Sequence, residues 1–355
     1  MSPTQGSEPA ADMTTESDRR PAEPRRRPER SSKRPPPTAA TGRTGRGGRS
    51  GRTGRTGYGR GEARFGMAMA MPALLVTLLL LGYPLVYSFW VSLHEQTLGS
   101  RAPARWVGFD NYTAVLGDPV FLPSLTRTVL FAAAVVLGTL LLGTVFALAL
   151  NQDFRGRSVV RGVLILPWSL SQITLALTFG WIFNSTFGPL NGALQQAGVI
   201  DRYVAWFASG RVALTVMAVA FVWSLVPFAT LLILGALQTV PEDLHKAARI
   251  DGAGPVRRFF FVTLPWIRDT VLVVSVLALI NAFLAFALIY ILTGGGPGTE
   301  TTLLSWWGYT TAFRDLDLGR GAAIFYLMTL AMVLLAALTA LVIRGPRRNR
   351  EGRTA

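Results

Sequence analysis

Six long runs of apolar residues divide this chain, and each is about as long as the roughly 20 residues that a helix needs to cross a bilayer. The first run begins too late and is too long for a cleaved signal peptide, so we expect it to remain as a span. The pattern predicts an all-α integral membrane fold over residues 65–343, with six transmembrane helices at about 67–93, 128–150, 159–183, 212–237, 270–292 and 321–343.

Basic tails flank the predicted membrane domain. Residues 1–64 hold 15 Lys and Arg against 7 Asp and Glu, and they are rich in Gly, Pro and Ser. They have little apolar surface to bury, so we expect a disordered cytoplasmic tail. Such a tail can bind nucleic acid, but attraction to anionic membrane lipid is the interpretation that we favour, and no specific nucleic acid is expected. Residues 344–355 predict a second basic cytoplasmic tail.

The distribution of Lys and Arg predicts the orientation in the membrane, because cytoplasmic loops keep positive charge. Basic residues gather in the two tails and in the loops 151–158 and 238–269, whereas the three loops on the other side hold seven arginines in total. We therefore expect a multi-pass protein with both termini in the cytoplasm and with 238–269 on the cytoplasmic side.

Several classes of chemistry lack the residues that they need. The chain has no Cys, its two histidines are His94 and His245, and it contains neither a phosphate-binding Gly-rich loop nor a zinc-binding H-E-x-x-H. We expect no enzyme activity, metal or cofactor on this chain. No Asp, Glu, Lys or His lies deep in a predicted span, although ion-coupled transporters typically need such a group. Energy then comes from a partner, or transport is passive, as in a stand-alone facilitator.

The segment after the fourth predicted span, residues 241–265, carries strong helix signals. Pro241 suits a first helical position, Glu242 and Asp243 suit the positive end of a helix, and Gly252 is a typical stop. We expect Pro265 to break the chain before the fifth span. A face of Leu244, Ala247, Ala248 and Asp251 is too smooth for a membrane anchor, so this short helix is interpreted as a docking element. The alternative is an ordinary loop.

This segment resembles the EAA loop in permease subunits of binding-protein-dependent ABC importers. The family pattern is E-A-A, three residues, Gly, nine residues, an apolar residue, one more, and Leu-Pro. Here it falls on Lys246-Ala247-Ala248, Gly252, Val262 and Leu264-Pro265. The resemblance implies a cytoplasmic coupling helix between spans 4 and 5 that contacts an ATPase subunit through Lys246, Ala247, Ala248, Asp251, Gly252, Leu264 and Pro265. Because Lys246 replaces the usual Glu, we expect an acidic residue opposite it on the ATPase.

The resemblance extends over about 65–343, where the chain is similar to carbohydrate-uptake permeases of the maltose and glycerol-phosphate type, in particular the first permease of the pair. It is carried by "WVGFDNYTAVLGDPVF", "NQDFRGRSVVRGVLILPWSLSQ", "FGPLNGALQQAGV" and "LTGGGPGTETTLLSWWGYTTAFRDLDLGRGAA". It implies a bacterial plasma-membrane subunit that works with a second permease, ABC ATPase subunits and an extracellular solute-binding protein. The implied cargo is a sugar or related solute.

Neutral polar and aromatic residues within the spans are candidates for the solute path. Amides are costly in lipid without a partner, so we select Gln172 and Asn281, with Trp168 and Tyr290 as aromatic neighbours. The alternative is that hydroxyl and amide groups join one helix to another. In the loop before the last span, Trp306, Trp307 and Tyr309 are expected either at the membrane interface or in contact with the solute-binding protein.

Overall fold

A computed structural model of the chain describes residues 60–101 and 103–344. The C-terminal tail and almost all of the basic N-terminal tail therefore lie outside the described residues. Residues 60–64, which we expected in the tail, belong instead to the first helix, α1 (Arg60–Thr77). The regular secondary structure of the described part is helical apart from the short antiparallel pair of β1 (His94–Glu95) and β2 (Arg105–Trp106).

Five helical segments of the described part are long and apolar enough to cross a membrane, or six if one bent pair counts as a single span. The first runs from α1 through the π-turn η1 (Leu78–Gly82) into α2 (Tyr83–Ser92). The others are α4 (Phe121–Leu150), α8 (Gly210–Leu237), the segment Pro255–Leu292, and α14 (Leu318–Arg344). Long helices are the form in which a chain satisfies its own backbone groups in lipid.

The third predicted span is not one straight helix. The run 159–183 divides into α5 (Arg157–Ser169) and α6 (Gln172–Ile182), which are bent by 98°. Pro167 has no N–H for the last turn of α5, and Leu170 is extended. Ser171 then caps the new helix, because its hydroxyl oxygen accepts a hydrogen bond from the Thr174 N–H at 3.2 Å. The hydropathy pattern predicted the apolar length of this run, but it does not account for the break after Pro167 or for the new helix that starts after Ser171.

The core of the bundle forms where α4 packs along α8, and small residues allow the two backbones to approach. A Cβ atom on Gly143 would lie 2.8 Å from Ala229 Cβ, and one on Gly138 would lie 2.8 Å from a Val222 methyl carbon. Nearer the other end of the pair, the rings of Phe131 and Phe221 meet edge to face at 5.7 Å. The same core includes residues of α11 (Leu264–Phe283) and α12 (Ala287–Leu292).

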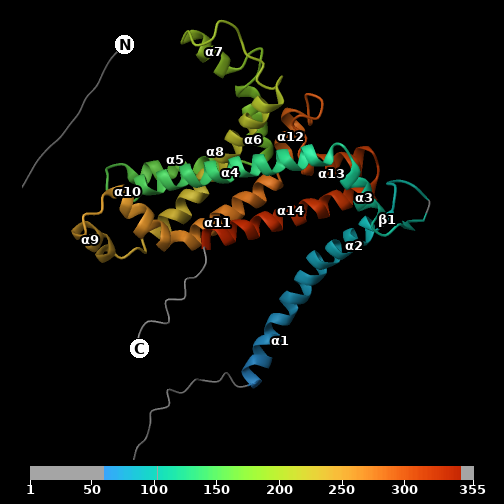
Figure 1. Cartoon of the computed structure of the whole chain (residues 1–355), viewed down its shortest axis with the longest axis horizontal. Coiled ribbons are helices and arrows are strands. Elements are labelled where there is room, and N and C mark those ends of the chain that lie inside the picture. The colour runs from blue at the N-terminus through green and yellow to red at the C-terminus, as the bar shows by residue number, and fades with distance from the viewer. Residues whose placement is uncertain (1–59, 102, 345–355) are drawn as a thin grey trace, which may run out of the picture. The chain divides into compact units, whose positions relative to one another are not determined.

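Short helices fill the connections between the long ones. They are α3 (Asp110–Gly117), α7 (Pro189–Gln196), α9 (Glu242–Ile250), α10 (Pro255–Arg258) and α13 (Leu304–Tyr309), with the π-turns η2 (Phe259–Thr263) and η3 (Thr310–Arg314). Figure 1 shows α9, α10 and the start of α5 at one end of the long helices, and β1 and α3 at the other. These two regions are here named the α9 end and the β1 end.

The segment before α14 contains the aromatic residues that we expected either at the membrane interface or in contact with the solute-binding protein. Trp306 is only 3% exposed and belongs to the core, and Trp307 is half-buried. Trp306 packs against Phe286 and Tyr290, with ring centroids 5.9 and 5.8 Å away. The backbone turn before α13 brings the tryptophan inward, where its large apolar surface is removed from water.

Buried polar groups fasten the β1 end. The Asn111 side-chain amide donates hydrogen bonds to the carbonyl oxygens of Ser92 (2.9 Å) and His94 (3.0 Å). The hydroxyls of Ser92 and Tyr112 lie 2.7 Å apart, and burial raises the pKa of Tyr112. Gly319 of α14 passes directly against the His94 carbonyl. The end of α2, α3 and the start of α14 are therefore tied together.

Candidate functional site

The helix α9 forms the connection between the two long segments α8 and Pro255–Leu292. Pro241 is its N-cap, with extended ψ of 131°, so the first helical residue is Glu242 and not Pro241 as we predicted. The difference is one residue and leaves the acidic pair Glu242 and Asp243 in the first turn. Arg249 lies in the last turn, so the charges at both ends of α9 oppose the helix dipole and stabilise the helix.

The C-terminal end of α9 is closed by a Schellman motif. Asp251 is the C-cap, and Gly252 follows with φ of +74°, a left-handed conformation that favours glycine. The Ala253 N–H donates to the Ala248 carbonyl at 2.9 Å, and the Gly252 N–H donates to the Arg249 carbonyl at 3.0 Å. Backbone bonds thus end the helix at a defined residue, without help from the rest of the protein.

The surface of α9 is open. None of its residues is buried, and Leu244 and Ile250 are 40% and 86% exposed. The exposed apolar surface continues beyond the helix on Val256, Phe260 and Phe261. Several large apolar side chains exposed in one segment are typical of a surface that contacts protein or membrane.

Lys246 is satisfied within its own helix. Its Nζ lies 3.2 Å from an Asp243 carboxylate oxygen and 3.6 Å from one of Glu242. These are i,i+3 and i,i+4 pairs between exposed side chains, which contribute a few tenths of a kcal/mol at most, about 0.3–0.5. Lys246 therefore reaches the surface of α9 as the centre of a small cluster of mixed charge.

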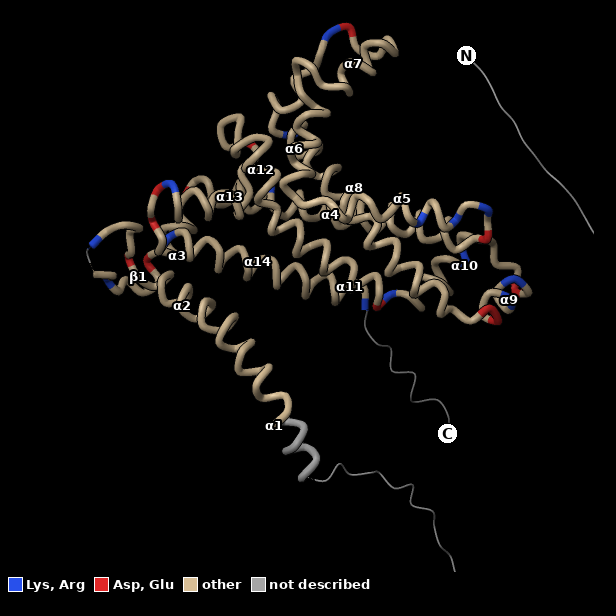
Figure 2. Tube along the Cα trace, turned by 180° about the vertical axis from the view of Figure 1, so that it is seen from behind, with Lys and Arg blue, Asp and Glu red and all other residues tan. Residues whose placement is uncertain are grey.

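Behind α9 lies a polar cleft of about 760 Å³. It is bounded by the connection between α4 and α5, by α9 itself, and by α10 and η2; its polar lining includes Asn151, Gln152, Asp153, Glu242, His245, Lys246, Arg249 and Arg258. Figure 2 shows charged residues gathered at this end and at the β1 end, while the long helices between them are largely uncharged.

The two last residues of the predicted coupling pattern begin α11. Leu264 and Pro265 continue a helical segment that runs from Pro255, so the predicted chain break at Pro265 is wrong. In a regular helix the proline ring would meet the carbonyl of residue 261. The π-turn Phe259–Thr263 directly precedes it and widens the helix, and this absorbs the proline. Motion of α10 is thereby connected to α11 through continuous helix.

The four residues predicted for the solute path lie in separate surroundings. Trp168 stacks on Phe228 at 5.7 Å, whereas Tyr290, 50% exposed, belongs to the aromatic group around Trp306. Gln172 begins α6, directly after the bend. The Asn281 amide donates to the Leu277 carbonyl of its own helix at 2.8 Å. Among the described residues no hydrogen bond or ring contact joins any two of these four.

Hydroxyl groups inside the long helices bond mainly within their own helix. Ser224 donates to the Phe221 carbonyl at 2.9 Å, and Ser275 donates to the Val271 carbonyl at 2.7 Å. These two hydrogen bonds therefore do not join one helix to another, which was the alternative role for such side chains. A hydroxyl bonded back to its own turn is satisfied in lipid and needs no neighbouring helix.

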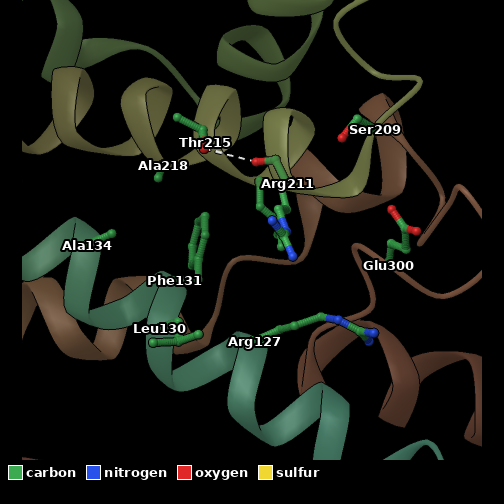
Figure 3. Close-up of a pocket in the computed structure, with 10 residues that line it drawn as sticks. Arg127, Leu130, Phe131, Ala134, Ser209, Arg211, Thr215, Ala218 and Glu300 are labelled. Carbon is green, nitrogen blue, oxygen red and sulfur yellow. Dashed lines mark hydrogen bonds between the residues drawn. The ribbon is translucent and has the colours of Figure 1, made fainter.

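Sequence reasoning missed a groove near the β1 end of α4 and α8. It has a volume of about 780 Å³ and includes Arg127, Arg211 and Glu300 in its lining. Figure 3 shows Arg211 of α8 pointing toward α4, while the Arg127 side chain extends sideways from α4. Both arginines were assigned to loops because the hydropathy runs begin after them, but α4 begins at Phe121 and α8 at Gly210. Helical periodicity from Phe121 would have placed Arg127 on a helix face.

Comparison with known families assigns the membrane part of the chain. Residues 139–345 match the family described as the binding-protein-dependent transport system inner membrane component. The matched region contains α9, its Schellman cap and the Leu264-Pro265 pair. This chain belongs to that family.

Relatives of this permease are similar over most of their length. It is 34% identical to the sulfoquinovosyl glycerol transport system permease protein SmoG of Agrobacterium fabrum, over 80% of this chain and 92% of the relative. It is 37% identical to the trehalose/maltose transport system permease protein MalF of Thermococcus litoralis, over 82% of this chain and 96% of the relative. Membership of this family favours a permease subunit over a stand-alone facilitator.

The fold of the permease is also that of a solved transporter. A crystal structure of a bacterial alginate ABC transporter in complex with its alginate pentasaccharide-bound periplasmic protein matches with a TM-score of 0.68 at 18% identity. The match covers 82% of this chain and 98% of the solved chain. The likeness at this identity concerns the fold alone, and it agrees with an all-helical inner-membrane component.

Proposed function

We propose that this permease is one of two membrane subunits of an ABC importer, and that α9 transmits the movement of an ATPase subunit to the long helices. The observation that carries the proposal is the geometry of α9. The C-terminal end of the helix is closed by its own backbone bonds, and Leu244 and Ile250 are exposed. A short turn at residues 251–254 joins it to the continuous helical segment that runs from α10 into α11. Lys246, Ala247, Ala248, Asp251 and Gly252 form the proposed contact, and Leu264 and Pro265 transmit the movement.

The proposed topology has six spans, with the bent pair α5 and α6 counted as one. An odd number of crossings would place the C-terminal tail and the N-terminal tail on opposite sides. Six crossings place both basic tails and α9 on the cytoplasmic side, in agreement with the excess of positive charge there. The β1 end then faces outward, toward an extracellular solute-binding protein.

A sugar or related solute is the proposed cargo. The names of two relatives support it, because SmoG is described as transporting sulfoquinovosyl glycerol and the Thermococcus relative as transporting trehalose and maltose. Gln172 and Asn281 remain the proposed polar contacts, with Trp168 and Tyr290 as aromatic surfaces. They would line one path only together with the second permease subunit, because the described contacts do not bring them together.

Energy is proposed to come from ATP hydrolysis on a separate subunit. The sequence has no phosphate-binding loop of its own, so this chain is expected to need no cofactor. The exposed cluster around Lys246 is the proposed contact with an acidic residue of the ATPase, in place of the carboxylate that the family usually presents.

Reconstitution tests the proposal directly. Solute uptake is measured in vesicles that hold this permease alone, and in vesicles that hold it with its second permease, ATPase and solute-binding protein. We expect ATP-dependent uptake only in the complete system, and its loss when residues 242–252 are replaced by a Gly/Ser linker of equal length. Uptake by the permease alone, or full ATP-driven uptake without α9, would contradict the proposal.

A further inference from the structure

We propose that the groove between the β1 ends of α4 and α8 binds an anionic phospholipid. The phosphate is held by Arg127 and Arg211, and an acyl chain lies along the apolar floor. This inference needs only that the chain spans a membrane, and it does not depend on the transported solute or on the role of α9. A failure of one proposal therefore leaves the other unaffected.

The charge of the groove calls for an anion. The described residues contain no ion pair between Arg127 or Arg211 and any carboxylate. Glu300 also lines the groove, but one of its carboxylate oxygens accepts the Gly210 N–H at 2.9 Å. Arg127 also donates to the Thr299 carbonyl at 2.8 Å. Two guanidinium groups against one carboxylate leave an excess of positive charge.

The floor of the groove is apolar, which distinguishes a lipid from a soluble anion. It is formed by Leu130, Phe131, Ala134, Leu214 and Ala218. The polar side chain Thr215 donates to the Arg211 carbonyl at 2.9 Å and has no free hydrogen to offer. Along this floor a sugar would meet few hydrogen-bonding groups, whereas an acyl chain needs none.

The position and the length of the groove suit a lipid of the leaflet at the β1 end. Arg127 and Arg211 lie at the ends of the apolar stretches of α4 and α8, which is headgroup depth. From Arg127 to Ala134 the helix rises about 10 Å. A second apolar cavity of about 810 Å³ shares Ala134 and Ala218 and continues toward Phe146. The groove and this cavity together extend over more than the thickness of one leaflet, about 15 Å.

The test uses a photo-crosslinkable phosphatidylglycerol whose reactive group is in the acyl chain. The full-length permease is reconstituted in phosphatidylcholine vesicles that contain this probe, and labelled peptides are mapped after irradiation. We expect labelling of α4 and α8 around Leu130, Ala134 and Ala218. Unlabelled phosphatidylglycerol should compete far better than added phosphatidylcholine, and inorganic phosphate should not compete.

Two variants separate the roles of charge and of the apolar floor. Arg127→Gln combined with Arg211→Gln should lower labelling about 30-fold, since each basic residue near an anionic surface contributes severalfold. Arg101→Gln combined with Arg202→Gln, which changes two exposed arginines outside the groove, should leave labelling unchanged. Ala134→Phe fills the exposed floor and should abolish labelling with both arginines intact, whereas Ala133→Phe, also exposed but outside the groove, should not.

Three results would overturn the inference. The first is equal labelling of the groove variants and their controls. The second is displacement of the probe by inorganic phosphate, which would identify a site for free anions. The third is labelling elsewhere on the permease, with α4 and α8 unmarked in the groove.

Discussion

The two ends of the helical bundle are built by opposite means. At the β1 end the buried Asn111 amide bonds two carbonyls, and Gly319 packs against the His94 backbone. At the α9 end no residue of α9 is buried, and the helix is closed at its C-terminal end by the backbone bonds of the turn at Gly252. Buried, satisfied polar groups hold helices in one arrangement, whereas a self-capped exposed helix keeps its shape while its surroundings move. The difference agrees with a fixed β1 end and with the proposed contact between α9 and an ATPase subunit.

Gly319→Ala should give the largest effect on stability. The new Cβ atom would collide with the His94 carbonyl oxygen and lie 2.9 Å from Asn111 Nδ2. Because the contact is backbone, we expect overpacking to cost about 1–3 kcal/mol of the free energy of unfolding. Thermal unfolding in nanodiscs measures this loss.

Gly117→Ala provides the control for that experiment. Gly117 lies in α3 at the same end, and a Cβ atom there meets nothing within 4 Å. It should unfold at the temperature of the unchanged permease or slightly above it. If both variants unfold alike, the β1 end is not held in the way described here.

Gly252→Ala should weaken coupling while leaving global stability unchanged. An alanine at φ of +74° is strained by roughly 1–2 kcal/mol, and the cost falls on the end of α9 because nothing else packs on this residue. We expect ATP-driven uptake by the complete transporter to fall about 5- to 30-fold, with little change in the unfolding temperature.

Gly254→Ala is the matched control, two residues along, with φ of −65° and open space around it. Uptake by this variant should equal that of the unchanged permease. Equal losses in the two variants would show that the Schellman turn at Gly252 has no special role.

Substitution of Lys246 should have the smallest effect on the stability of the permease itself. Lys246→Gln removes two exposed ion pairs, so α9 should lose only about 0.3–0.5 kcal/mol and the unfolding temperature should not change. Lys246→Glu adds a third carboxylate beside Glu242 and Asp243. We expect it to lower ATP-driven uptake more than Gln does, because it would also face the proposed acidic residue of the ATPase. Higher uptake by the Lys246→Glu variant than by the unchanged permease would contradict the proposed acidic residue on the ATPase.

Much of the site could be predicted because its causes are local. The acidic first turn, the glycine stop and the spacing up to Leu264 and Pro265 are properties of neighbouring residues. The error at Pro265 had a different origin, since a π-turn five residues long absorbed the proline. The inward turn of Trp306 was missed for a similar reason, because composition describes a loop but not the direction in which its side chains point.

The sequence by itself determined that long apolar helices would form and, to within one residue, where the short capped helix would begin and end, because hydropathy and helix caps act over a few residues. Tertiary structure alone decided which groups from distant segments meet. The amide of Asn111 reaches the end of α2, and the arginines of α4 and α8 share one groove, only because the long helices pack side by side. That packing depends on the volume of small residues such as Gly143 at the contact between helices, which no pattern along a single helix expresses.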